Sequence, residues 1–423
     1  MLYARSAGIL LVLGVAVFAA RTPELSRQEK VMVTQAVQSE ADFAAGLYRQ
    51  LSQTADGGNL FFSPHSVATI LALTADGARG QTAREMVSVL KLQARIDGQG
   101  VPDLSTVQSA IAALHSQLDS RDDKTELTVA NALWADAGMP LRKPFVQGIL
   151  AADPAAAIEN VDFLKNPETA RTRINNWTDR KTSGRIKELL AAGSLDDMTR
   201  LVLTNAVYFR GDWATQFQSN RTRPTDFTGA SGGEPVRIPL MFGLVQAGYA
   251  DLEGFSVLDL PYAGGKLSLL VILPDHLDGL SKIETQLSSD WLARQVASLK
   301  TQQVRVGLPR FRLETQYSLK GTLSEMGMPT AFGRSADLTG LTDASEGRQL
   351  SISQVEHKAF LEVNEQGSEA AAATAVVVTA RSARPRAAAF IANRPFLFAI
   401  RDRASGLLLF LGRLSQPQPQ PAK

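Results

Sequence analysis

The sequence predicts an α+β fold, because helix-type periodicity dominates its first part and β-type patterns dominate from about residue 201 onward. Since helices and strands do not alternate along the chain, large and mostly antiparallel sheets are expected, and a βαβ fold is disfavoured. The length of 423 residues alone would suggest two or three domains. No fixed-period repeat or long linker divides the chain, however, so we expect one domain.

The helical part consists of segments whose apolar residues recur near the 3.6-residue period. The longest is Glu29 to Leu51, with Met32, Ala36, Phe43 and Leu47 on one face. The predicted helices are Glu29 to Leu51, Ser66 to Thr74, Ala83 to Leu90, Val107 to Leu118 and a stretch that opens at Asn166-Pro167 and continues through Ile174 and Trp177.

The strand part begins with Leu201 to Phe209, a nearly continuous β-prone run typical of a strand buried on both faces. The run from Val304 to Leu313 alternates with a change of phase around Pro309. Two short apolar runs near the end, Phe396–Ile400 and Leu407–Leu411, are joined by a polar turn and predict a hairpin. Further strands are predicted at Val257–Leu260 and Leu267–Leu273.

The composition excludes several classes of function. Cysteine is absent, which excludes disulfides, thiolate zinc sites and thiol nucleophiles. The net charge of +2 gives no electrostatic footprint for nucleic acid or an anionic membrane. Acid–base or metal chemistry would depend on four histidines, so an enzyme is disfavoured and no metal or cofactor is predicted; these are His65, His115, His276 and His357.

The first 20 residues have the pattern of a secretory signal peptide. One cation, Arg5, precedes an apolar run from Ala7 to Ala20, and small residues follow at the expected cleavage point. The alternative is a membrane anchor, but the run is shorter than the roughly 20 residues that span a bilayer. We therefore expect an exported, soluble chain without stable membrane association. Residues 416–423 form a Pro/Gln-rich tail.

One catalytic motif is formally present, since Gly229 to Gly233 match the G-x-S-x-G pattern of a hydrolase with Ser231 as nucleophile. That motif requires a strand before the serine and a helix after it. The flanks, Thr225–Thr228 and Glu234-Pro235, instead predict a turn, so this alternative is disfavoured.

The segment from Glu365 to Phe390 has an unusual composition. Written as a strand, it places only small or medium uncharged residues on one face from Ser368 to Ala380. Such a face can enter a sheet interior without burying a charge. Three arginines follow within six residues and indicate an exposed tip that a protease could cut; they are Arg381, Arg384 and Arg386. The segment therefore combines a latent strand with a cleavable loop.

At these residues the chain resembles a serpin, and the resemblance covers about Gln28 to Ser415. Five motifs carry it in the expected order, which makes the resemblance specific. They are NLFFSPHS at 59–66, GARGQT at 77–82, LTNAVYFRGDW at 203–213, HKAFLEVNEQGSEAA at 357–371 and NRPFLF at 393–398.

The resemblance implies a single domain over residues 28–415 with three β-sheets, eight to nine helices and an exposed reactive loop at about 365–390. It also implies that a protease attacks this loop, and that the cut loop then inserts as a strand in the main sheet and traps the acyl-enzyme. The loop's hinge would be formed by Glu365, Gly367, Ser368, Glu369, Ala370, Ala371, Ala372 and Ala373.

The family's hinge-to-bait spacing places the cleaved bond at Arg381-Ser382. Arginine at this position fits the acidic pocket of trypsin-like proteases, so such a protease is the expected covalent partner of a monomeric inhibitor. Arg384 precedes Pro385, which is unfavourable for cleavage. Arg386-Ala387 is an alternative, although its use would make the inserted strand about five residues too long.

The resemblance also assigns a sheet-opening cluster, a set of residues beneath the sheet at the place where its strands part. It implies that His357 is a hydrogen-bonded core residue and not a catalytic base. A non-inhibitory serpin, such as a chaperone, a carrier or a plain protease substrate, is the alternative function. The hinge argues against this alternative, because it lacks the bulky, charged or proline residues that non-inhibitory serpins often carry there. The implied cluster residues are Ser63, Ser66, Asn205 and His357, together with Trp213 as the tryptophan near the insertion point.

Overall fold

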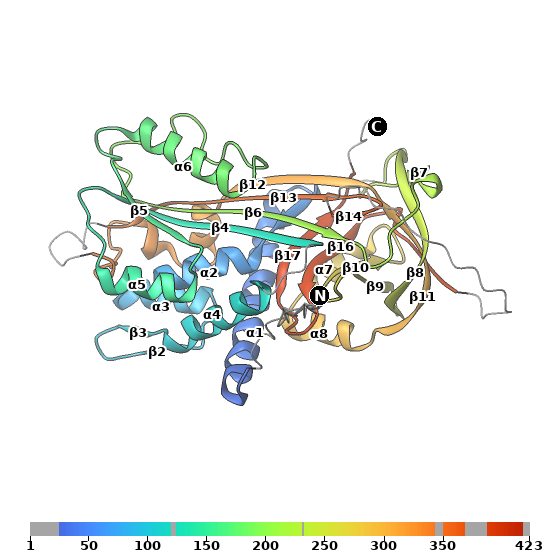
Figure 1. Ribbon diagram of the computed structural model, residues 1–423, viewed down its shortest axis with the longest axis horizontal. Helices are drawn as coiled ribbons and strands as arrows, with labels where there is room; N and C mark the ends of the chain where they lie inside the picture. The colour runs from blue at the N-terminus through green and yellow to red at the C-terminus, as the bar shows by residue number, and fades with distance from the viewer. Residues whose placement is uncertain (1–24, 120–123, 231, 343–349, 369–386, 418–423) are drawn as a thin grey trace, which may run out of the picture.

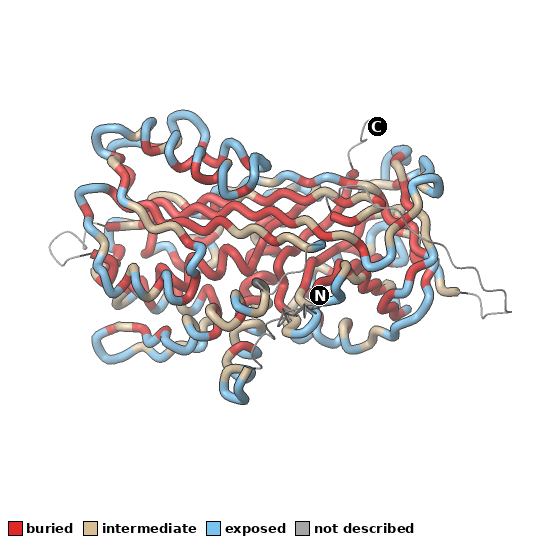
Figure 2. The backbone as a smooth tube through the Cα atoms, viewed as in Figure 1, coloured by how far each residue is buried: buried red, intermediate tan, exposed pale blue. Residues whose placement is uncertain are grey.

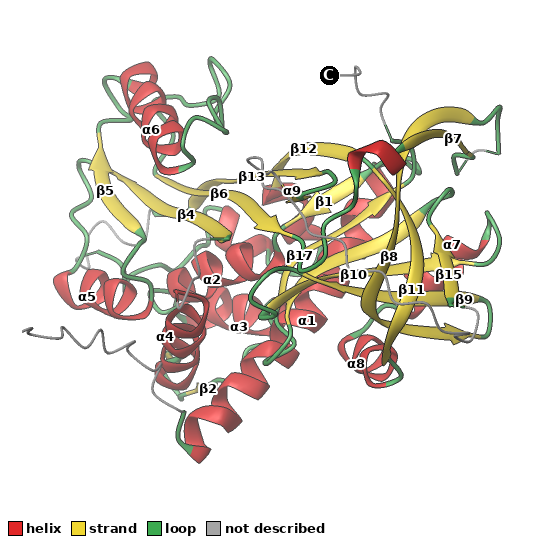
Figure 3. Ribbon diagram, turned by 45° about the vertical axis from the view of Figure 1, so that its right-hand side comes forward, coloured by secondary structure: helices red, strands yellow, loops and turns green. Residues whose placement is uncertain are grey.

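The computed structural model describes residues 25–119, 124–230, 232–342, 350–368 and 387–417. In this part of the chain, helices from the first half cover one end of a long sheet, and strands from the second half form a second sheet at the other end (Figure 1). Three sheets and nine α-helices are present in the described ranges, as the resemblance implies. The helix–sheet layering is clearest in Figure 3.

The helices begin where the sequence supplies capping chemistry. The first helix, α1, is capped by Ser26, whose Oγ accepts from the Glu29 amide at 3.2 Å while the Glu29 carboxylate accepts from the Ser26 amide. Proline occupies the first turn of α2, α5 and α6, where its missing N–H costs nothing. The helices are α1 Arg27–Thr54, α2 Pro64–Ala75, α3 Gly80–Val89, α4 Ser105–Asp119, α5 Lys143–Ala152, α6 Pro167–Lys181, α7 Gly279–Gln286, α8 Ser289–Ala297 and α9 Leu319–Glu325.

The long sheet has the strand order β12-β13-β14-β6-β4-β5. Its central strand β6 is buried along almost its whole length, as the continuous apolar run predicts. Strands β13 and β6 are parallel, and β12–β13 and β4–β6 are antiparallel. The strands are β4 Thr125–Asp136, β5 Ala157–Val161, β6 Leu201–Asp212, β12 Phe311–Ser318, β13 Ile352–Val363 and β14 Gly367–Ser368.

The second sheet has nine strands in the order β1-β17-β16-β10-β9-β8-β11-β15, with β7 paired to β8. Its β16 and β17 form the predicted C-terminal hairpin. A third sheet consists of β2 (Arg95–Ile96) and β3 (Pro102–Asp103). The nine strands are β1 Leu60–Phe62, β7 Arg223–Phe227, β8 Val236–Leu252, β9 Phe255–Pro261, β10 Leu267–Pro274, β11 Lys300–Pro309, β15 Ala388–Ile391, β16 Phe396–Asp402 and β17 Leu408–Leu414.

Apolar clusters lie on both faces of the six-stranded sheet, whose strands are mostly buried (Figure 2). Its inner face packs on the second sheet and on α2, all of whose residues are buried. Its outer face is covered by α6, where Trp177 packs edge-to-face on Trp134 of β4. Both faces of β6 are therefore covered by protein, which explains its lack of polar alternation.

The predicted helices and strands are present with small shifts at their ends, and β11 and β12 are separated at Arg310, next to the phase change. The interpretation of the Ser231 flanks as a turn is wrong on one side, since Thr225 lies in β7. The next element is the strand β8 and not a helix, so the flanks do not form a hydrolase elbow. Ser231 itself lies outside the described residues.

Over the described ranges, no helix combines the length and apolarity that a bilayer crossing requires.

Candidate functional site

The site is the seam between β13 and β6 in the six-stranded sheet. These strands pair directly from Ile352↔Leu201 to Phe360↔Tyr208, and beyond this point β14 lies between them. In β14, Ser368 pairs antiparallel with Val363 on one side and with Gly211 on the other. The first two residues of an additional strand are thus already seated at one end of the seam.

The chain that leads into β14 is held by Trp213, at the end of β6. The Trp213 amide donates to the Gln366 carbonyl at 2.7 Å, and its indole Nε1 donates to the Asn364 carbonyl at 2.8 Å. Its ring stacks on Tyr262 with centroids 4.6 Å apart. Trp213 therefore fixes the backbone turn from which β14 enters the sheet.

The entrance of the seam is narrow. A Cβ built on Gly367 would lie 1.9 Å from the Gly211 carbonyl oxygen, so a larger residue at position 367 would displace the strand. Ser368 is fully buried, and its hydroxyl lies 2.8 Å from that of Tyr262. Burial raises the pKa of Tyr262 well above its ordinary value, so this phenol is neutral. The entrance accepts a small polar residue.

Glu365 is fixed by charge and hydrogen bonds although only 6% of its surface is exposed. One carboxylate oxygen lies 2.8 Å from Arg310 Nε, and the other accepts from the Thr222 hydroxyl at 2.6 Å. The Phe217 amide donates to the Glu365 carbonyl at 2.8 Å. Together these contacts join the hinge to residues that directly precede β7 and that connect β11 with β12.

A buried polar cluster lies beneath the directly paired part of the seam. His357 Nδ1 lies 2.5 Å from Asn205 Oδ1, and the Ser63 amide donates to His357 Nε2 at 3.0 Å. The Asn205 amide donates to Ser66 and to Asn131. Burial lowers the pKa of His357 to about 3, so the ring is neutral and donates from Nδ1. His357 is a structural bridge between β13, β6 and α2.

Trp213, the expected tryptophan near the insertion point, lies apart from this cluster. Ser63, Ser66, Asn205 and His357 are joined by direct hydrogen bonds. Trp213 lies about eight residues farther along β6, or about 26 Å at about 3.3 Å per residue, and contacts the hinge instead. The prediction missed Asn131, which completes the cluster from β4.

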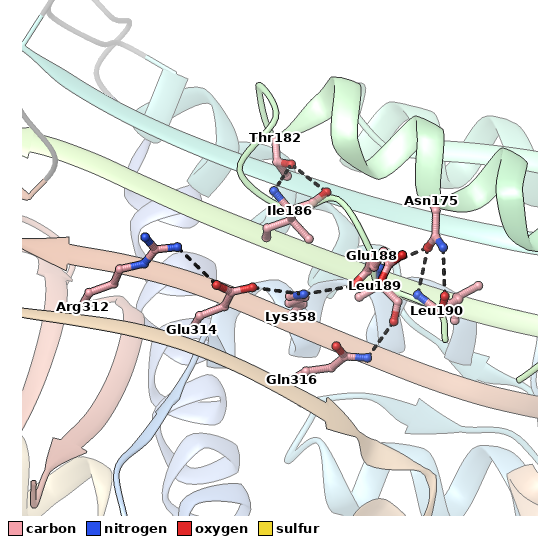
Figure 4. A network of polar contacts seen from close by, with 10 residues as sticks. All are labelled: Asn175, Thr182, Ile186, Glu188, Leu189, Leu190, Arg312, Glu314, Gln316 and Lys358. Carbon is pink, nitrogen blue, oxygen red and sulfur yellow. Dashed lines mark hydrogen bonds and ion pairs between the residues drawn. The ribbon is translucent and has the colours of Figure 1, made fainter. Parts of the chain in front are cut away.

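On the outer face, the connection between α6 and β6 crosses the seam. We call residues 182–200 the strap. Asn175 of α6 accepts from the Leu189 and Leu190 amides at 3.1 and 2.9 Å. On the other side of the seam, Gln316 of β12 donates to the Leu189 carbonyl at 2.8 Å and Lys358 of β13 donates to the Glu188 carbonyl at 2.9 Å (Figure 4). The strap therefore ties α6 to the strands beyond the seam.

The remaining predicted site residues lie outside the described residues. They are the hinge positions Glu369, Ala370, Ala371, Ala372 and Ala373 and the reactive bond Arg381-Ser382. Within the described ranges, no group of three or more His, Asp or Glu side chains could hold a metal ion.

Comparison with known proteins identifies this architecture. The family model described as "Serpin (serine protease inhibitor)" matches residues 38–417. The chain is 37% identical to the leukocyte elastase inhibitor of Sus scrofa, over 89% of this chain and 97% of that protein. It is 35% identical to antithrombin-III of Mus musculus, over 89% and 80%. Human thyroxine-binding globulin, solved with thyroxine, superposes with a TM-score of 0.80 at 26% identity, over 92% and 100%.

Proposed function

The chain belongs to the serpin family of serine protease inhibitors, and from this membership we propose that it is an exported suicide inhibitor of trypsin-like serine proteases. In this proposal Arg381-Ser382 is the bait bond of an exposed reactive loop. Export rests on the signal-like residues 1–20. N-terminal sequencing of protein recovered outside the cytoplasm would test the export step.

The observation that carries the proposal is the position of β14. Ser368 opposes Val363 and Gly211 in antiparallel register, and His357 opposes Asn205 in parallel register. If β14 were extended in both antiparallel registers, Thr374 would lie opposite His357 of β13 on one side and opposite Asn205 of β6 on the other. The two registers agree, so residues from Ser368 onward fit the seam as one continuous strand.

The side chains that would enter the interior also fit. Residues alternate across a strand, so every second residue after Ser368 points the same way as its buried hydroxyl. Thr374 is a polar residue on this face, and its register places it at the His357–Asn205 hydrogen bond. Its hydroxyl would there replace a contact that separation of the strands breaks. The other residues on this face, Ala370, Ala372, Val376, Val378 and Ala380, are apolar and uncharged.

The chemistry is acyl transfer, after which insertion of the loop competes with hydrolysis of the ester. The protease serine attacks the Arg381 carbonyl, the bond to the Ser382 nitrogen breaks, and that nitrogen leaves with a proton as a free amine. Arg381 remains joined to the protease as an ester. Insertion of the freed loop then carries the protease along the sheet and distorts its active site before water hydrolyses the ester. The inhibitor is consumed in the process.

The free energy gained by inserting the strand is large enough to displace the protease and distort its active site. A strand from Ser368 to Ala380 has about 13 residues and spans roughly 43 Å at about 3.3 Å per residue. If it gains about a dozen hydrogen bonds at about 0.5–1.5 kcal/mol each, it contributes on the order of 6–18 kcal/mol. This is comparable with the whole stability of a domain, about 5–15 kcal/mol. The uncut form is therefore a kinetic trap.

Incubation with trypsin tests the proposal. We expect a complex that survives SDS, a mass that maps the cut to Arg381-Ser382, and a cut protein that melts at a higher temperature than the intact one. Arg381→Ala should abolish the complex, whereas Arg386→Ala should not. Cleavage without a complex and without a rise in melting temperature would overturn the proposal.

A carrier function is the second candidate, favoured by the similarity in fold to thyroxine-binding globulin, which was solved with thyroxine bound. A carrier would be clipped by trypsin and would not trap it. The same incubation therefore distinguishes the two functions.

A further inference from the structure

A line of buried polar and charged side chains runs from the helices to the seam. At its outer end Glu40 of α1 faces His65 of α2, with 2.8 Å between the carboxylate oxygen and Nδ1. The His65 ring meets that of His115 on α4 edge-to-face, with centroids 5.5 Å apart. His115 Nδ1 lies 3.7 Å from the Asp153 carboxylate, at the end of α5. Four elements thus place two histidines between two acids.

The line continues from Asp153 into the polar cluster. The second Asp153 oxygen accepts from the Asn131 amide of β4 at 3.2 Å, and Asn131 in turn accepts from Asn205 of β6. Asn205 accepts from His357 across the seam. Direct contacts therefore connect the charged group at the helices to the hydrogen bond that closes the seam.

The charged group is largely buried, with the His115 side chain 16% exposed. His65 is 1% exposed and Asp153 is 3% exposed, while Glu40 is 9% exposed. Buried charges are stable only when they are paired, so the charge on the histidines decides how strongly the two acids hold these elements together. Burial alone would lower the pKa of His65, but the Glu40 carboxylate and then that of Asp153 outweigh it and raise the pKa. The groups facing His65 are thus Glu40, His115 and Asp153.

Entry of a strand changes the geometry of this line. Adjacent strands lie about 4.8 Å apart, so β6 and β4 must move away from β13 by about this distance when β14 extends. Asn205 and Asn131 move with them, whereas α2 is fixed to the second sheet through the Ser63 hydroxyl and the Leu409 carbonyl, 2.7 Å apart. Asp153 leads from α5 into β5, which pairs with β4, so it moves with these strands. The contacts of Asn205 with Ser66, and of Asp153 with the histidines of α2 and α4, are then stretched.

We propose that the protonation state of the His65–His115 pair controls the rate at which the seam opens, so that loop insertion is slower in mildly acidic than in mildly alkaline solution. Protonation places a cation between Glu40 and Asp153 and holds Asp153, and through it β4, against the helices. Loss of the proton removes this attraction, and the strands separate more readily. This inference rests on the proposed function, because it concerns the same insertion step.

A protease-free assay tests it. A synthetic peptide with the sequence 368–380 is incubated with the intact protein between pH 5.5 and 8.5, and its entry is followed by native electrophoresis and by the rise in melting temperature. We expect entry into the wild type to be about tenfold slower at the acidic end, which corresponds to a barrier higher by about 1.4 kcal/mol.

Three variants locate the effect. The peptide should enter the His65→Gln variant at a rate nearly independent of pH. If that variant does not fold, the His115→Gln variant should show a reduced pH dependence of peptide entry. Glu40→Gln should move the midpoint to lower pH while keeping the dependence, which a purely structural role would not do. His276→Gln, at an exposed histidine outside this line of contacts, is the matched control and should behave as the wild type.

The outcomes separate this inference from the proposed function. A wild-type pH profile in a folded His65→Gln or His115→Gln variant overturns the inference and leaves the inhibitor function intact. A wild type that accepts the peptide at no pH and forms no complex with trypsin overturns the proposed function, and the inference with it.

Discussion

Ser368 and Tyr262 share a hydrogen bond of 2.8 Å between their hydroxyl groups in the fully buried space where β13 and β6 part. Tyr262 also stacks on Trp213, which holds the preceding turn. In the proposed function Ser368 is the first residue of the inserting strand, and it would be recognised by the hydroxyl group of Tyr262, which directly follows β9 of the other sheet. This contact would then set the starting register of insertion.

A charged side chain at this position should convert the inhibitor into a substrate. Ser368→Arg would bury an unpaired cation beside Tyr262, which slows entry of the loop and allows water to hydrolyse the ester first. We expect a rise of about tenfold or more in the number of inhibitor molecules consumed per trypsin molecule inhibited, as for a barrier higher by about 1.4 kcal/mol. Ser368→Ala, which keeps the size small, is the control. An unchanged stoichiometry of inhibition in Ser368→Arg would contradict the proposed role of Ser368 in loop entry.

The Glu365–Arg310 ion pair should hold the hinge at the end of the seam where β14 begins. Glu365→Lys replaces the carboxylate that lies 2.8 Å from Arg310 Nε with a second cation and leaves the Thr222 hydroxyl without its acceptor. We expect the seam to open and to accept the loop of another molecule, so that oligomers form on mild heating. Native electrophoresis and light scattering measure this.

A charge swap separates the ion pair from other effects of the substitution. The double variant Glu365→Lys with Arg310→Glu restores opposite charges and should remain monomeric for longer than the single variant. If the double variant oligomerises as quickly as Glu365→Lys alone, the ion pair is not the cause.

The sequence predicts the long helices and the buried strands well, because these depend on local periodicity. Leu201 to Phe209 is an example, since an apolar run of this length fits only a strand covered on both faces. Not every buried strand was predicted, since β4, β8 and β13 were missed, as were the shorter helices α5, α7, α8 and α9.

The site required knowledge of long-range register. Asn131 has no sequence signal, because only the pairing of β4 with β6 brings it to Asn205. Trp213 and Asn205 lie in one sequence motif, yet an extended strand carries them far apart. The strap was not predicted, since most of its anchors are backbone carbonyls that any sequence supplies.

Acid should destabilise the intact protein through His357. The unfolded ring takes up a proton near pH 6.5, whereas the buried ring does so only near pH 3. Between these values the unfolded state binds more protons, so stability falls as the pH falls, by about 1.4 kcal/mol per pH unit. His357→Gln should flatten this part of the curve, measured as melting temperature against pH from 6.5 to 5. His276→Gln should leave the slope unchanged.

Glu356 should destabilise the protein at neutral and alkaline pH. Burial raises its pKa to about 7, and the hydrogen bond from Ser318 opposes this only in part. The unfolded carboxyl ionises near pH 4.5, so stability is lost as the pH rises from 4.5 through 7. Glu356→Gln should therefore raise stability at pH 8 by on the order of 1–3 kcal/mol. The half-buried Glu362 on the same face of β13 provides the control variant Glu362→Gln, and an equal gain there would contradict the assignment to Glu356.

The strap should slow insertion, because separation of β6 from β13 pulls α6 away from Gln316 and Lys358. Gln316→Ala removes one anchor beyond the seam, and we expect faster peptide entry together with a lower melting temperature of the intact form. Loss of one such hydrogen bond corresponds to about 0.5–1.5 kcal/mol, or roughly a two- to tenfold change in rate if the bond is fully broken in the transition state. Thr172→Ala, on the exposed side of α6, removes a hydrogen bond that does not reach the sheet and should leave both quantities unchanged. If Gln316→Ala lowers the melting temperature without accelerating entry, the strap stabilises the fold but does not restrain the seam.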